Sequence, residues 1–171
     1  MVSRRLRADV ILLLMWSLTG CTHHDDGFAR LQDRQAKCEA ILAKDQTNYP
    51  AMHDLAMIYS TLYVRDVQTG ASSAQACKEK ALTMVHGALK QAPLGGRADL
   101  GMALERLGYN QEALSVYEKF LEDAQHIPVP VPPLASNAPP VMEREAEANW
   151  RGLITIVQTH VDLLKKSLGT S

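Results

Sequence analysis

The side chains that could carry out chemistry are few and scattered along the 171-residue chain. Residues 23–26 read His-His-Asp-Asp, which are metal-ligand types, but four consecutive side chains rarely converge on one ion, so a solvated spacer is the simpler interpretation. Glu143, Glu145 and Glu147 begin a predicted helix, where acids favour the positive end of the dipole. The sequence has no GxSxG, HExxH or phosphate-binding glycine motif. We therefore predict a protein that is not an enzyme and has no metal or cofactor.

The first 20 residues have the pattern of a secretory signal. Three arginines precede a short apolar run at 10–18, which is far shorter than the roughly 20 residues that span a bilayer. The run ends in Leu18-Thr19-Gly20-Cys21, which resembles the lipobox of bacterial lipoproteins. The resemblance implies that Cys21 becomes a lipidated N-terminus, and that Thr22 after it directs the protein to the outer membrane, facing the periplasm. The alternative is an uncleaved anchor in which Cys21 is a chance cysteine.

Two further cysteines, Cys38 and Cys77, leave two interpretations open. An even pair in an oxidising compartment favours a disulfide, provided that the two Cα atoms come within about 7 Å. Both cysteines fall in helices that would be neighbours in a stack of helical pairs. The other interpretation is two buried, small hydrophobic residues. Neither cysteine belongs to a CxxC motif, so nothing indicates redox catalysis.

The elements that must position these side chains are predicted to be helices throughout, which gives an all-α fold. The clearest pair is 100–121, two short antiparallel helices joined at residues 108–110. Apolar residues recur there at helical spacing: Leu100, Ala103, Leu104 and Leu107, then Ala113, Val116, Tyr117, Phe120 and Leu121. Gly108 can adopt the positive φ that ends a helix. Such a hairpin cannot bury its apolar stripes alone, so we expect helices stacked on both sides of it.

This hairpin resembles a tetratricopeptide repeat. The positions that carry the resemblance have the family's spacing of small, large and aromatic residues: Gly101, Leu104, Gly108, Ala113 and Tyr117. Two positions depart, because the family prefers a small residue at Phe120 and a proline at Gln125. The resemblance covers about 38–121 and implies a stack of antiparallel helical hairpins over residues 28–125.

Upstream of the hairpin the pattern predicts three more helices. They are Phe28–Lys44 after a polar tether at 21–27, Met52–Tyr63, and a third that starts after Ser72 or Ser73 and carries Ala81. Residues 64–73, with Gly70 as a breaker, are predicted to be an irregular insertion. Pro93 stands where the family places a proline, and Leu94-Gly95-Gly96 is predicted to be the turn after it.

Downstream, residues 126–141 form a proline-rich linker, because proline forbids helix and favours extended polyproline conformation. Residues 142–168 are then predicted to be one amphipathic helix. We interpret this helix as a cap on the open end of the stack, with Trp150 as its anchor. The alternative is a free-standing helix that binds a partner, and the proline segment could itself lie in the groove of the stack.

The net charge of the chain bears on the class of partner that it is expected to bind. The net charge is −1, and removal of residues 1–20, which hold three Arg and one Asp, leaves 15 basic and 18 acidic residues and a net charge of −3. There is neither a basic stripe nor an aromatic platform, so nucleic acid is not an expected partner.

The family resemblance implies a concave face that binds a peptide segment of another protein. The matching positions are His53, Met57, Ser60, Thr61, Met102, Glu105 and Arg106. Small tetratricopeptide lipoproteins of this plan resemble pilotins and other assembly or scaffolding factors of secretion and pilus machines, and this gives the first functional hypothesis, with the bilayer and an envelope protein as partners. Two alternatives stay open: an adaptor for peptidoglycan enzymes or a protease, and a small hydrolytic or ligand-binding accessory with its site at the proline loop.

Overall fold

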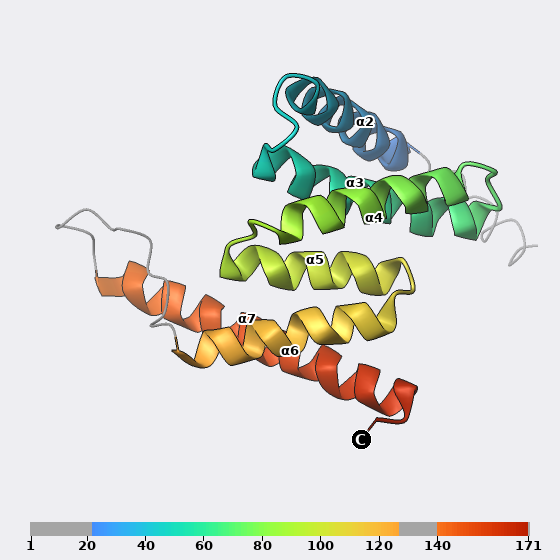
Figure 1. Ribbon diagram of the computed structural model, residues 1–171. Helices are drawn as coiled ribbons and strands as arrows, with labels where there is room; N and C mark the ends of the chain where they lie inside the picture. Colours follow the sequence, from blue (N-terminus) through green and yellow to red (C-terminus); the bar gives the residue numbers. More distant parts are fainter. Residues whose placement is uncertain (1–21, 127–139, 171) are drawn as a thin grey trace, which may run out of the picture.

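The protein is all-helical over the residues that its computed structural model describes, 22–126 and 140–170. The described helices follow one another along the chain as α2 to α7 (Figure 1). Each helix packs against the next one, and α3 also packs against α5. None of the described helices is long and apolar enough to cross a membrane. The predicted signal segment and Cys21 lie outside the described residues, as does most of the proline-rich linker.

The helices α2 (Thr22–Leu42) and α3 (Tyr49–Thr69) are both longer than predicted. Residues 22–42 contain no proline that would interrupt a helix. Residues 22–27 of the predicted tether belong to α2. Asn48 caps α3, because its side-chain oxygen accepts a hydrogen bond of 3.1 Å from the backbone N–H of Ala51. The predicted irregular insertion was largely wrong: α3 continues through it until Gly70, whose φ of 68° ends the helix.

Two other boundaries differ from the predictions. The helix α4 (Ala74–Leu89) begins after Ser73, but the Ser73 hydroxyl does not cap it and instead donates a 2.6 Å hydrogen bond to the buried carboxylate of Asp66. The helix α5 (Leu94–Arg106) includes the predicted turn as its first turn. Pro93 precedes α5 in an extended conformation, and a helix can start directly after it because its own missing N–H is not needed there.

The hairpin of α5 and α6 (Asn110–His126) was correctly predicted. Gly108 has a φ of 81°, and the chain turns there through hydrogen bonds from Gly108 N to Glu105 O and from Tyr109 N to Leu104 O. The two helices approach closely at Gly101, where an added Cβ would lie 2.4 Å from Cε1 of Tyr117. A glycine at this position is therefore required by the fully buried Tyr117 ring.

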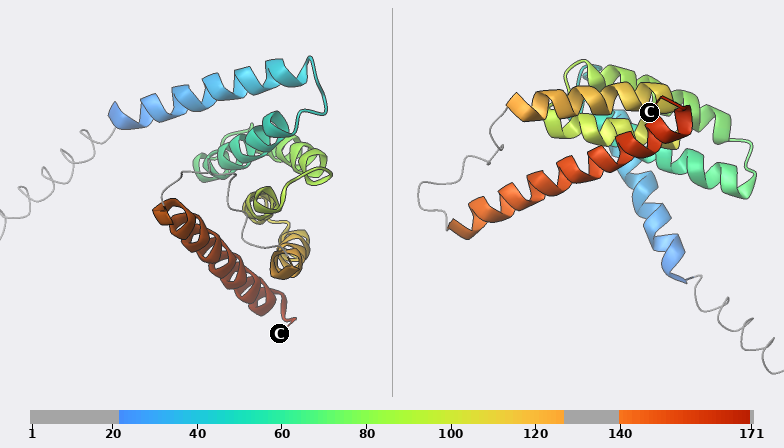
Figure 2. Two further views of the ribbon diagram at one scale, coloured as in Figure 1. Left: turned by 90° about the vertical axis from the view of Figure 1, so that its left-hand side faces the viewer. Right: turned by 90° about the horizontal axis from the view of Figure 1, so that it is seen from below.

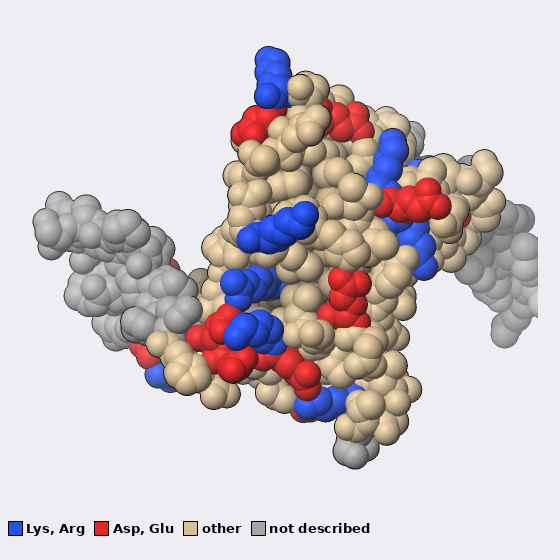
Figure 3. Space-filling view, viewed as in Figure 1, with Lys and Arg blue, Asp and Glu red and all other residues tan. Residues whose placement is uncertain are grey.

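The helices are arranged in two layers (Figure 2). Seen along their axes, α3 and α5 lie on one side and α4 and α6 on the other, while α2 and α7 lie at opposite ends of the stack. One apolar core runs from α3 to α7, and a second joins α2, α3 and α4. On the face that Figure 1 presents, Lys and Arg side chains are interspersed with Asp and Glu (Figure 3).

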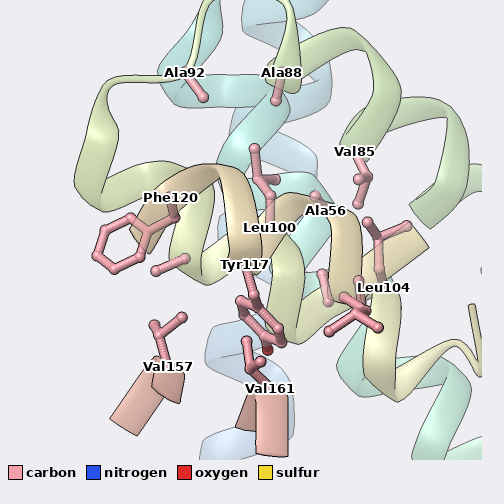
Figure 4. Close-up of a cluster of buried hydrophobic side chains, with 14 of the residues drawn as sticks. Ala56, Val85, Ala88, Ala92, Leu100, Leu104, Tyr117, Phe120, Val157 and Val161 are labelled. Atoms are coloured by element: carbon pink, nitrogen blue, oxygen red, sulfur yellow. The ribbon is translucent and has the colours of Figure 1, made fainter. Parts of the chain in front are cut away.

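The helix α7 (Pro140–Leu168) is packed against α6 and is not free-standing. Trp150 meets Phe120 edge to face, with ring centroids 5.7 Å apart, as expected for its anchoring role. Val157 and Val161 lie across from Phe120 and Tyr117 (Figure 4). The large Phe120, where the tetratricopeptide pattern prefers a small residue, thus fills the space between α6 and α7.

Candidate functional site

The candidate site is the surface that α3 and α5 expose together, which we call the inner face. It consists of Met57 and Thr61 on α3 and of Asp99, Met102 and Arg106 on α5. The residues of each helix are three or four positions apart and therefore lie on one side of it. Both methionines pack partly against the core and keep part of their side chains exposed.

His53 links the two helices of the inner face. Its Nε2 lies 3.2 Å from Oδ2 of Asp99, and its Nδ1 lies 3.8 Å from Oδ1 of Asp54. The hydrogen bond with Asp99 raises the pKa of His53 above its ordinary value, although partial burial opposes this. The Tyr49 ring lies beside the imidazole, with centroids 5.7 Å apart. The pair links α3 to α5 beside the inner face.

One edge of the inner face is closed by α2. The Arg34 guanidinium donates hydrogen bonds of 2.8 and 3.0 Å to the Asp54 carboxylate, which lies beside His53 on α3. The Cys38 thiol lies 3.9 Å from the same carboxylate. Burial raises the pKa of Cys38, so the thiol stays protonated and is a poor nucleophile.

The opposite edge is closed by α7. Nδ1 of His160 lies 2.7 Å from Oε2 of Glu105, and the Tyr117 hydroxyl donates a 3.2 Å hydrogen bond to the same oxygen. Burial and the Glu105 charge both raise the pKa of Tyr117, which therefore remains a donor. The Glu105 carboxylate thus links α7 to α5, and its Oε2 has both partners within the chain.

The predicted groove residues fall into two groups. Met57, Thr61, Met102 and Arg106 lie on the inner face, with His53 partly exposed between its helices. Ser60 was wrongly included, because it shares a helix side with Ala56, is fully buried and donates a 3.1 Å hydrogen bond to the carbonyl of Met57. Glu105 points to α7 rather than to an open groove.

The possible disulfide between Cys38 and Cys77 is not formed, and both thiols are free. Cys38 lies beside Asp54, whereas the Cys77 thiol donates a 3.6 Å hydrogen bond to Asp66. These carboxylates are 12 residues apart on α3, or about 18 Å at 1.5 Å per residue. The two cysteines therefore flank different parts of α3, and the interpretation as small core residues fits the structure.

Sequence reasoning missed Asp54, Asp99 and His160. Asp99 is 46 residues from His53, and His160 is 55 residues from Glu105, so no local spacing indicates either pair. A possible signal for Asp99 was its position three residues before Met102, on the same side of α5.

The inner face presents thioether, hydroxyl, carboxylate and guanidinium groups that could contact a bound segment. A His–Asp pair could act as a base, but it would need a nucleophile or a polarised substrate group within reach. The nearby Ser60 is buried, and the Thr61 hydroxyl donates to the carbonyl of Met57 at 2.8 Å. Within the described part of the chain, no group of three or more His, Cys, Asp or Glu side chains could hold a metal ion. The side chains of residues 23–26 are outside the described part of the structure.

A shallow depression of about 590 Å³ lies between α6 and α7. Its lining is mostly polar: Ser115, Glu118, Lys119, Leu121, Glu122, Gln125, Gln158, Val161 and Lys165. Lys165 and Glu118 form an ion pair of 2.8 Å that joins its two walls. Charges already paired across an open surface offer little to a ligand, so the inner face remains the stronger candidate.

Comparison of the chain with protein-family models, with curated proteins and with solved structures finds no match.

Proposed function

We propose that the protein is a lipoprotein of the bacterial outer membrane that binds a segment of another envelope protein on its inner face. Cys21 carries the lipid, the helical stack faces the periplasm, and the bound protein is a component of a secretion or pilus complex that is assembled or held at the membrane. The observation that carries the proposal is the inner face itself: two helices joined by the His53–Asp99 pair and exposing side chains suited to recognition.

The proposed stack is of the tetratricopeptide type. Support comes from Gly101, which accommodates Tyr117, and from Gly108, which ends α5. The layer of α3 and α5 corresponds to the first helices of successive hairpins, which line the concave surface in that family. In this interpretation α7 takes the place of a further hairpin and covers α6.

The side chains of the inner face suit a peptide segment. Met57 and Met102 are flexible and polarizable, so they can adapt to apolar side chains of different shape. Arg106 is exposed at the end of α5 and can make paired hydrogen bonds with a carboxylate of the peptide. The His53–Asp99 pair links the two helices before a segment binds, which lowers the ordering cost of binding.

The proposal is tested by affinity purification from detergent-solubilised envelopes with Thr61→Arg as the probe variant. A bulky charge at this exposed position should obstruct a bound segment and lower partner recovery about tenfold. Thr83→Arg on α4 is the matched control, because the Thr61 and Thr83 hydroxyls donate the same kind of bond to the carbonyl four residues earlier, at 2.8 and 2.9 Å. Equal recovery with both variants would contradict the proposal.

A further inference from the structure

The side of α7 that points away from α6 carries an uncharged stripe with apolar side chains. Its members are spaced by three or four residues and so share one side of the helix: Ala148, Gly152, Ile156, Thr159 and Leu163. All five are exposed, with Ile156 at 52% and Leu163 at 59%. These two are half of the four large hydrophobic residues that are exposed in the described part of the chain. The buried residues of α7, such as Val157 and Leu164, lie on the other side.

Gly152 lies in the middle of this stripe, and no contact within the described residues requires a glycine there. A Cβ added at Gly152 would have no atom within 4 Å. A glycine within a helix weakens it, because the backbone gains freedom in the unfolded chain and there is no side chain to pack. On a helix surface, however, a glycine lets another helix approach closely. A helix from outside the chain can therefore approach α7 closely at Gly152.

We propose that this stripe is a dimer interface, on which α7 of a second copy of the chain packs in the antiparallel direction. A two-fold axis passing between Thr155 and Ile156 places Ala148 opposite Leu163 of the second copy. The same axis places Gly152 opposite Thr159. Small residues fill the first half of the stripe and larger ones the second half, so the surface is complementary to itself, as an interface with two-fold symmetry requires.

Charge selects the same arrangement. Glu145 and Lys166 are exposed at opposite ends of the stripe, and the same axis brings Glu145 of each copy opposite Lys166 of the other. A parallel pairing would instead place like charges together at both ends. Arg151 and Asp162 share one edge of the stripe, and the antiparallel arrangement brings them near each other, although Arg151 already pairs with Glu147 within α7. The pattern fits a second copy of this helix.

The dimer goes beyond the proposed function, because it uses exposed residues of α7 that are not part of the inner face. If the chain forms no dimer, the proposed function still stands, and if the inner face binds no segment, the dimer still stands. In the dimer two inner faces and two lipid anchors would belong to one assembly. Each copy would then bind its segment beside the other, which raises the overall affinity for a partner with repeated segments.

The test is sedimentation velocity of the full chain purified in detergent, over a range of concentrations. We expect a dimer that dissociates on dilution. Gly152→Leu should weaken it by about tenfold or more, because the added side chain blocks close approach, while its Cβ has no described atom of its own chain within 4 Å. Gly27→Leu is the matched control, because Gly27 is also an exposed helical glycine with open space around it. The dimer of the Gly27→Leu variant should dissociate at the same concentration as the wild-type dimer.

A charge reversal tests the orientation. Glu145→Lys alone should weaken the dimer, and adding Lys166→Glu to the same chain should restore it, since each pair again joins opposite charges. Circular dichroism checks that the variants keep their helical content. A wild-type chain that stays monomeric at the highest attainable concentration would overturn the proposal. A dimer that is insensitive to Gly152→Leu and to the single reversal would overturn it as well.

Discussion

At the scale of residues, three histidine–carboxylate pairs join helices that are not consecutive in the chain. His53 pairs with Asp99 between α3 and α5. His86 lies 2.7 Å from Glu112 between α4 and α6, and His160 lies 2.7 Å from Glu105 between α7 and α5. For His53, whose pKa is raised by the hydrogen bond with Asp99, the contact between its two helices depends on pH.

His53→Gln should make this dependence measurable. The hydrogen bond with Asp99 holds the pKa of His53 above its ordinary value of 6.5, so the charged pair stabilises the fold fully below pH 6.5 and loses its effect as pH rises through the folded-state pKa. We expect the variant to lose up to about 1 kcal/mol of unfolding free energy near pH 5.5, and less near pH 8.5, because the pair is partly exposed. Urea titration at the two pH values measures both losses, and equal losses would contradict the assignment.

At the scale of elements, the sequence was informative where every local signal agreed. The hairpin at 100–121 has helical periodicity, a glycine stop and a small residue opposite a large one, so its helices and their close contact were predictable. The end of α3 was predicted too early: residues 64–69 contain neither glycine nor proline, and Gly70 is the first residue after Tyr63 that favours a helix end. Ser60 was misplaced for a related reason: helical spacing alone does not show which side neighbouring helices cover.

The close contact within that hairpin gives a second stability test, Gly101→Ala. The new Cβ would lie 2.4 Å from the Tyr117 ring, and this ring is fully buried and has little room to move. We expect a loss of about 1–3 kcal/mol from overpacking, despite the better helix propensity of alanine. Gly95→Ala in the same helix has no atom within 4 Å of its Cβ and should be neutral or stabilising. Thermal or urea unfolding compares the two, and similar effects would contradict the role given to Gly101.

At the scale of the whole molecule, the proposed lipid anchor lies at one end of the chain, and the helical stack that follows it carries the inner face. The all-helical class followed from periodicity and composition. The edges of the inner face did not, because α2 and α7 reach them through pairs such as Arg34–Asp54 and Glu105–His160, which join segments far apart in the sequence. Long-range contacts therefore decide which side of the stack stays open, and no local sequence pattern indicates these contacts.

The most direct test of the central claim is site-specific photo-crosslinking in bacterial cells, with the photoreactive residue at Thr61 and, as control, at Thr83. The account predicts a crosslinked protein of defined mass from Thr61 in the membrane fraction and none from Thr83. With Cys21→Ala added, the chain should leave the membrane fraction, because its lipid attachment site is gone. Equal crosslinking from both positions, or an unchanged membrane location without Cys21, would contradict the account.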